Sequence, residues 1–170
     1  MNTVKNKFNI FRILLLISGF LLLGWYNSAS AALVSVSGAI STNITWDAAN
    51  TYQVTSSITL NAGYTLTIPA GTFVKFNPGT SMIVYGNLQA IGTALNPIYF
   101  TSRDDDSIGE IVTGSDGNPV RWDWSKIDMR TWSSNSVLDH VLIKYPQYGI
   151  YTYNITNFTL KNSTITETLW

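Results

Sequence analysis

Ile58 to Ser102 reads ITLNAGYTLTIPAGTFVKFNPGTSMIVYGNLQAIGTALNPIYFTS, and the second half of this stretch repeats the first. The repeat is carried by pairs of apolar residues that recur after 22 to 24 positions. Ile58-x-Leu60 is matched by Met82-x-Val84, Leu66-x-Ile68 by Leu88-x-Ala90, and Val74-x-Phe76 by Ile98-x-Phe100. Short strands and glycine turns repeating at this period are typical of solenoid proteins. The stretch therefore predicts an all-β chain of stacked coils.

Apolar and polar residues alternate within each predicted strand. Leu66 and Ile68 lie on one face of their strand, and Thr65 and Thr67 lie on the other. Equivalent short strands of successive coils would pair in parallel, with their apolar faces stacked inside. We therefore expect a parallel β-helix with a central column of Leu, Ile, Val, Met and Phe side chains.

The same residues resemble the secreted bacterial right-handed parallel β-helix repeat proteins of the pectate-lyase-like solenoid superfamily. The matching motifs are Thr45-Trp46, Asn50-Thr-Tyr52-Gln-Val54-Thr55, Ala62-Gly63-Tyr-Thr65-Leu-Thr67-Ile68, Pro69-Ala-Gly71-Thr72-Phe-Val74-Lys75-Phe76, Gly86-Asn-Leu88-Gln-Ala90, Gly92-Thr93 and Asn96-Pro97-Ile98-Tyr-Phe100-Thr101-Ser102. The resemblance implies a right-handed parallel β-helix on an exported protein. It implies no particular reaction, because these motifs describe the scaffold.

Residues 1–31 have the three parts of a secretory signal peptide. The basic residues Lys5, Lys7 and Arg12 come first, the apolar run Ile13 to Trp25 follows, and Ala29-Ser30-Ala31 supplies the small residues of a cleavage site. The apolar run is shorter than the roughly 20 residues that span a bilayer. We expect cleavage after Ala31, a secreted or cell-surface location, and no membrane span in the mature chain.

The charges argue against a nucleic-acid partner. Of the ten basic and ten acidic residues, seven and ten remain after the predicted cleavage, a net charge of −3. No basic stripe survives to neutralise phosphates. The chain has no cysteine, which excludes disulfides, thiolate metal sites and cysteine nucleophiles.

The chain on either side of the repeat divides into a cap and further coils. Residues 32–57 fit the period poorly, so we expect an irregular N-terminal cap in which Trp46 plugs the open end of the core. Residues 58–170 supply the coils. Ile127 to Ile150 spans one of them, and His140 to Tyr145 aligns with Asn157 to Asn162.

The last coil ends uncovered at Trp170. A solenoid needs a terminal cap, so Trp170 covers the coil, a partner covers it, or further coils follow. We favour the last of these.

An acidic insertion, residues 103–123, interrupts the period. Calcium binds roughly six to eight oxygen ligands. Several of these could come from the acidic residues of the insertion, Asp104, Asp105, Asp106, Glu110 and Asp116. Their spacing does not follow that of a calcium-binding EF-hand loop. The sequence favours a solvated acidic loop without a cofactor, with calcium as the alternative.

The chemistry of the chain favours binding over catalysis. A glycosidase needs paired carboxylates held together, and the consecutive acids of the insertion point in diverging directions. His140 is the single histidine and has no acid or nucleophile at motif spacing. Trp122, Trp124 and Trp132 form the predicted ligand patch beside the insertion.

We therefore expect an exported non-catalytic module of a surface or extracellular protein that binds a polysaccharide or a cell-surface partner. The alternative is a polysaccharide lyase or hydrolase whose catalytic coils lie beyond Trp170.

Overall fold

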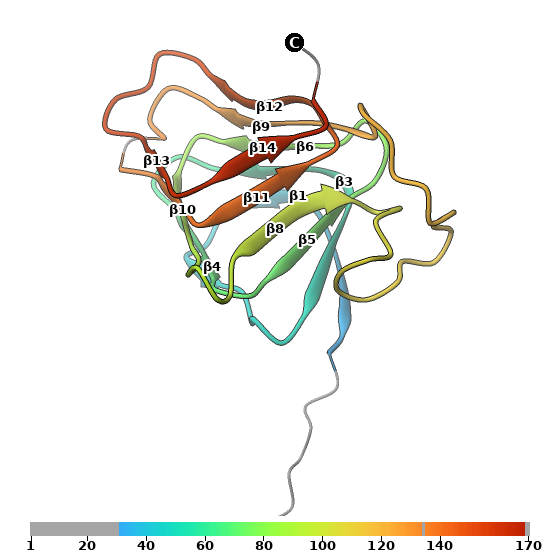
Figure 1. Ribbon diagram of the computed structural model, residues 1–170. Helices are drawn as coiled ribbons and strands as arrows, with labels where there is room; N and C mark the ends of the chain where they lie inside the picture. The colour runs from blue at the N-terminus through green and yellow to red at the C-terminus, as the bar shows by residue number, and fades with distance from the viewer. Residues whose placement is uncertain (1–30, 134, 169–170) are drawn as a thin grey trace, which may run out of the picture. The chain divides into compact units, whose positions relative to one another are not determined.

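The structure is a computed structural model and describes residues 31–168 apart from Ser134 (Figure 1). The predicted signal peptide lies outside these residues, except for Ala31. Within the described part the chain forms fourteen strands and no helix. They are β1 (Leu33–Ile40), β2 (Ile44–Thr45), β3 (Thr51–Leu60), β4 (Thr65–Pro69), β5 (Phe73–Phe76), β6 (Ser81–Val84), β7 (Asn87–Ile91), β8 (Ile98–Ser102), β9 (Trp124–Met129), β10 (Val137–Asp139), β11 (Val141–Lys144), β12 (Pro146–Thr152), β13 (Thr159–Lys161) and β14 (Thr164–Thr166).

The strands wind into a parallel β-solenoid of about six turns. Its three faces are named here by their strands. Face A holds the first half of β3 with β5, β8, β11 and β14, and face B holds the second half of β3 with β6, β9 and β12. Face C is the five-stranded sheet of β2, β4, β7, β10 and β13. All strand pairings in the described residues are parallel, which confirms the predicted fold class.

The alternation of apolar residues builds the core as expected. Leu66, Ile68, Leu88 and Ala90 are fully buried, because each points inward from face C while its neighbours point outward. Burying such side chains stabilises the fold by roughly 1.5–3 kcal/mol for each large residue.

Two of the three predicted pairings of the central repeat are confirmed. Ile58 pairs with Met82, and Leu66 pairs with Leu88. The third is wrong by two residues, since Val74 pairs with Phe100 and not with Ile98. The cause is the longer connection of residues 92–97, which Thr93 and Asn96 close with a backbone hydrogen bond. A shift of two residues keeps every side chain on its face, so the apolar pattern alone cannot detect it.

The alignment of the last coils also needs correction. Ile127 pairs with Ile150 as predicted. However, Asp139 pairs with Lys161 and Ile143 with Ile165, which places Asn162, and not Asn157, one coil beyond His140.

The N-terminal segment is more regular than predicted. β1 pairs in parallel with β3, and β2 with β4, so residues 33–45 already form most of a coil. The expectation of an irregular segment was wrong because Gly38 bends β1 between face A and face B without ending the strand pairing. Trp46 is buried and stacks on Tyr52 with ring centroids 4.1 Å apart, and its role as a plug of the open end stays a prediction.

Across the described residues no helix is long and apolar enough to cross a bilayer.

Candidate functional site

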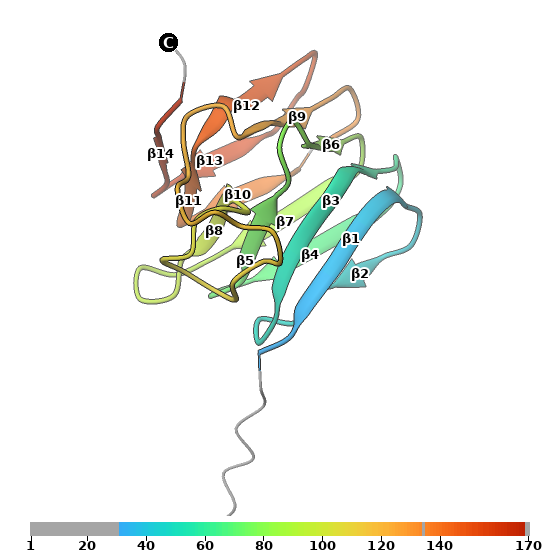
Figure 2. The same cartoon turned by 90° about the vertical axis from the view of Figure 1, so that its right-hand side faces the viewer.

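The acidic insertion lies against the outer surface of face A (Figure 2). Lys75 of β5 points outward beneath it and is fully buried. Its Nζ donates hydrogen bonds to the backbone carbonyl oxygens of Asp105 and Glu110, each at 2.8 Å. Burial lowers the pKa of Lys75, and the acidic residues of the insertion, Asp106 foremost, oppose the shift. The insertion is therefore anchored to face A at Asp105 and Glu110, while most of residues 107–122 are exposed, in line with a solvated loop.

Asp105 is the second anchor. Its Oδ2 accepts hydrogen bonds from Thr101 of β8 at 2.8 Å and from Lys144 of β11 at 3.1 Å, and its Oδ1 accepts from Ser107. Burial raises the pKa of Asp105, but these hydrogen bonds outweigh it and hold the pKa below its ordinary value. Two neighbouring strands of face A thus bind the carboxylate of the inserted segment.

The structure does not bring the predicted calcium ligands together. Asp104 Oδ1 accepts from the backbone nitrogen of Asp116 at 3.3 Å, and Asp106 Oδ1 accepts from Ser115 at 2.8 Å. Glu110 and Asp116 have exposed side chains. Within the described ranges no group of three or more acidic or histidine side chains could hold a metal ion. The carboxylates of Asp104, Asp105 and Asp106 instead satisfy groups of their own chain, so the calcium alternative is not supported.

The three tryptophans of the predicted ligand patch lie in different environments. Trp124 is fully buried, stacks on Phe76 at 4.2 Å between ring centroids, and donates from Nε1 to the carbonyl oxygen of Lys144 at 2.8 Å. It cannot stack on a ligand, and its assignment as a ligand residue was wrong. Trp122 and Trp132 are 55% and 70% exposed, but they flank opposite ends of β9 and line different pockets. A single tryptophan patch does not exist.

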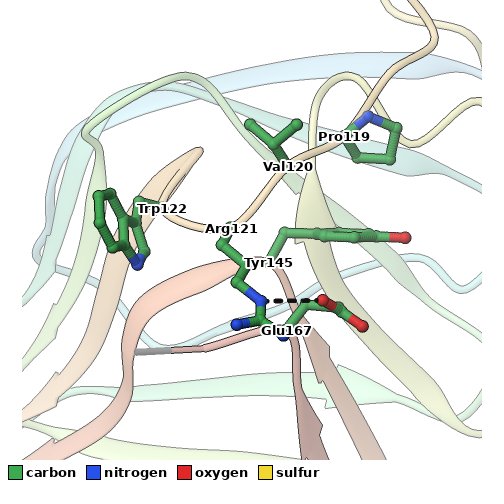
Figure 3. A pocket seen from close by; sticks show the side chains of 6 residues that line it. All are labelled: Pro119, Val120, Arg121, Trp122, Tyr145 and Glu167. Carbon is green, nitrogen blue, oxygen red and sulfur yellow. Dashed lines mark hydrogen bonds and ion pairs between the residues drawn. The ribbon is translucent and has the colours of Figure 1, made fainter. Parts of the chain in front are cut away.

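Trp122 instead belongs to a pocket of about 500 Å³ (Figure 3). The pocket is assembled from three parts of the chain: the end of the insertion, the β11–β12 corner and the residue that follows β14. Its lining residues are Pro119, Val120, Arg121, Trp122, Tyr145 and Glu167.

An exposed ion pair crosses this pocket. Arg121 Nε lies 3.2 Å from Glu167 Oε2. In Figure 3 the ion pair lies beside Tyr145. The ammonium nitrogen of Lys144 lies 5.0 Å from the centroid of the Tyr145 ring. Trp122 and Tyr145 both have positive φ, 74° and 63°, so the backbone turns sharply at each of these two corners.

Comparison with known proteins agrees with this fold. Residues 38–115 match the sequence family described as "Pectate-lyase like beta helix domain". The chain carries a pectate-lyase-like β-helix domain. Over 62 residues the chain is also 39% identical to Protein bark beetle of Drosophila melanogaster, an alignment that covers 36% of this chain and 2% of that protein. No solved structure gave a match.

The pocket lies outside the matched part of the β-helix domain. Arg121, Trp122, Tyr145 and Glu167 all follow residue 115. Of these four residues, Trp122 was predicted from the sequence as a ligand residue, and the other three were not. Arg121 and Glu167 lie 46 positions apart, and only the winding of two coils brings them together. The composition of the pocket, two aromatic rings with a donor and an acceptor, suits a small polar ligand with an apolar face.

His140 contributes to another surface cluster. Its Nδ1 lies 2.8 Å from Asp139 Oδ1, and Lys161 Nζ lies 3.3 Å from Asp139 Oδ2. Asn162 also donates to Asp139 Oδ1 at 3.0 Å. Asp139 thus joins β10 to β13, which is consistent with the structural or surface role predicted for His140.

Proposed function

We propose that the β-helix domain is an exported, non-catalytic module that binds a glycan in the pocket between Trp122 and Tyr145. The observation that carries the proposal is the meeting of two aromatic rings and one accessible ion pair in a single open pocket. Neither the rings nor the ion pair are needed for the core, since the core column is complete without them.

A sugar ring fits the chemistry of this pocket. Its C–H face is apolar and can pack on the ring of Trp122 or Tyr145, while its hydroxyl groups both donate and accept hydrogen bonds. Arg121 offers guanidinium donors, and Glu167 offers carboxylate acceptors. Because the two charges pair, the pocket carries no net charge from them, which favours a neutral sugar over an acidic one.

The export part of the proposal rests on residues 1–31. Their basic start, apolar run and small-residue end have the order of a signal peptide, and polysaccharides are encountered outside the cell.

The test compares Trp122→Ala with Trp132→Ala. The two tryptophans are both exposed and have nearly equal φ values, 74° and 77°, so any backbone effect of the substitution is matched. Cellobiose, xylobiose and chitobiose serve as calorimetric probes. We expect Trp122→Ala to weaken binding about tenfold or more and Trp132→Ala to leave it unchanged.

Equal binding by both variants and the parent protein would place the ligand elsewhere. Incubation with xylan, chitin and polygalacturonate, followed by measurement of chain length, tests the non-catalytic part. Shortened polysaccharide would contradict it and support the lyase or hydrolase alternative.

A further inference from the structure

We infer that the binding site extends from the Trp122 pocket along the outer surface of β9 and β12, so that the ligand is a chain of several sugars. This inference rests on the proposed function of the pocket. It concerns a surface that neither the repeat nor the pocket explains, formed by Lys126, Asp128 and Arg130 with Tyr151 and Tyr153.

Both strands of this surface begin at the pocket. Trp122 precedes β9 by two residues, and Tyr145 immediately precedes β12. β9 and β12 are neighbours in face B and run parallel, with Trp124 paired to Pro146 and Asp128 paired to Tyr151. A ligand that leaves the pocket in the strand direction therefore meets the outward side chains of both strands in turn.

The outward side chains form two cation–tyrosine pairs. Ile127 and Met129 point into the core, so Lys126 and Asp128 point out of it. Lys126 Nζ lies 4.5 Å from the ring centroid of Tyr151, and the Arg130 guanidinium lies 5.9 Å from that of Tyr153.

The two tyrosines are spaced to take successive sugars. Tyr151 and Tyr153 are 44% and 56% exposed. They are two residues apart, which in an extended strand is about 7 Å, more than the length of one sugar unit, so the two rings do not lie over the same sugar. Each ring can therefore pack against a different sugar.

Asp128 and Arg130 each have a polar atom that could hydrogen-bond to a sugar hydroxyl group. Asp128 Oδ2 receives Arg130 at 2.6 Å and lies 3.3 Å from Lys126 Nζ, and the Asp128 side chain is only 2% exposed. Among the described residues, Asp128 Oδ1 and Arg130 Nε have no hydrogen-bond partner. A hydroxyl can donate to the first and accept from the second. Both atoms lie beneath the surface, so the flexible ends of Lys126 and Arg130 must shift to admit it.

The test measures how affinity depends on chain length. The parent protein, Tyr151→Ala and Tyr153→Ala are titrated calorimetrically with cello-, xylo- and chito-oligosaccharides from disaccharide to hexasaccharide. We expect the parent affinity to rise with length in the series that binds. Each tyrosine variant should lose about three- to tenfold in hexasaccharide affinity and keep the disaccharide affinity. Tyr64→Ala, which removes a tyrosine beside β4 on another part of the solenoid, should change neither.

The outcomes separate this inference from the proposed function. Affinity that is independent of length, or tyrosine variants that bind hexasaccharide like the parent, would overturn the extended site and leave the pocket in place. No binding by any series would overturn the proposed function itself, and the extended site with it. Tyr153 follows the end of β12 and is exposed, so its variant keeps the test valid even if Tyr151→Ala fails to fold.

Discussion

The ammonium nitrogen of Lys75 lies 2.8 Å from the backbone carbonyl oxygen of Asp105, although 30 positions separate the two residues in sequence. A buried ammonium group is costly unless hydrogen bonds compensate it, and here two carbonyl oxygens of the insertion do so. Near its end the insertion carries Arg121 and Trp122, which line the candidate pocket. The Lys75 contacts therefore help to hold one wall of that pocket against the solenoid.

Lys75→Met should loosen the insertion. Methionine has a similar length but no donor, so the carbonyls of Asp105 and Glu110 lose their partner. We expect the free energy of unfolding to fall by about 1–3 kcal/mol, and protease cleavage within residues 103–123 to become faster. Urea unfolding and limited proteolysis measure the two effects. The exposed Lys161→Met is the control, and equal behaviour of the two variants would refute the anchoring role.

The Asp105 carboxylate should make the free energy of unfolding depend on pH in the acid range. Its pKa is lowered in the folded chain, so its stabilising contribution is present above the ordinary value of about 3.9 and is lost as pH falls through the folded pKa. Urea unfolding at neutral and acid pH compares the parent with Asp105→Asn. The difference in free energy of unfolding should shrink as pH falls below about 4. A difference that stays constant across this range would show that the Asp105 carboxylate is not the group responsible.

Trp124→Ala should lower the free energy of unfolding of the domain, and it should remove no contact with a ligand. The substitution removes a fully buried ring, its stacking on Phe76 and its hydrogen bond to Lys144. The expected loss is about 3–5 kcal/mol in the free energy of unfolding. Trp132→Ala, at an exposed position, should cost less than about 0.5 kcal/mol. Thermal denaturation followed by tryptophan fluorescence measures both, and similar losses would contradict the assignment of Trp124 to the core.

Gly86→Ala should disturb the stacking of two coils. A Cβ at this position would collide with the backbone carbonyl oxygens of Tyr64 and Asn61 in the preceding coil. Neither is a flexible side-chain end, so we expect a loss of about 1–3 kcal/mol. Gly114→Ala provides a comparison in open space, where the positive φ of 85° alone costs about 1 kcal/mol. Calorimetric melting temperatures should fall further for Gly86→Ala, and the reverse order would be inconsistent with the close approach.

Calcium should not stabilise the chain. The carboxylates of Asp104, Asp105 and Asp106 already accept hydrogen bonds from groups of the insertion and face A. A ligand that binds only the folded state raises the melting temperature once its free concentration exceeds its dissociation constant, and the increase grows with the logarithm of their ratio. Scanning calorimetry with millimolar calcium and with a chelator should therefore give the same midpoint. A higher midpoint with calcium would restore the metal site that the acidic composition first suggested.

The candidate site was harder to predict than the scaffold. Trp122 and Trp124 are two residues apart and look equivalent in sequence, yet one lines a pocket and the other fills the core. The difference arises because β9 begins at Trp124, whereas Trp122 lies in a turn with positive φ. The contacts of the acidic residues could not be predicted either, because the composition of the insertion does not reveal that Lys75 and Lys144 lie beneath it.

The sequence by itself determined the parallel β-solenoid. Strand alternation has a period of two and the coil a period of 22 to 24, so apolar residues such as Leu66 and Leu88 can share one core only if the coils stack. Tertiary structure alone decided the pairings shifted by the longer turn, the anchoring of the insertion by Lys75, and the placement of Trp122, Tyr145 and Glu167 around one pocket. These depend on contacts between residues of different coils, whose positions follow from the exact lengths of turns and insertions and not from a local pattern.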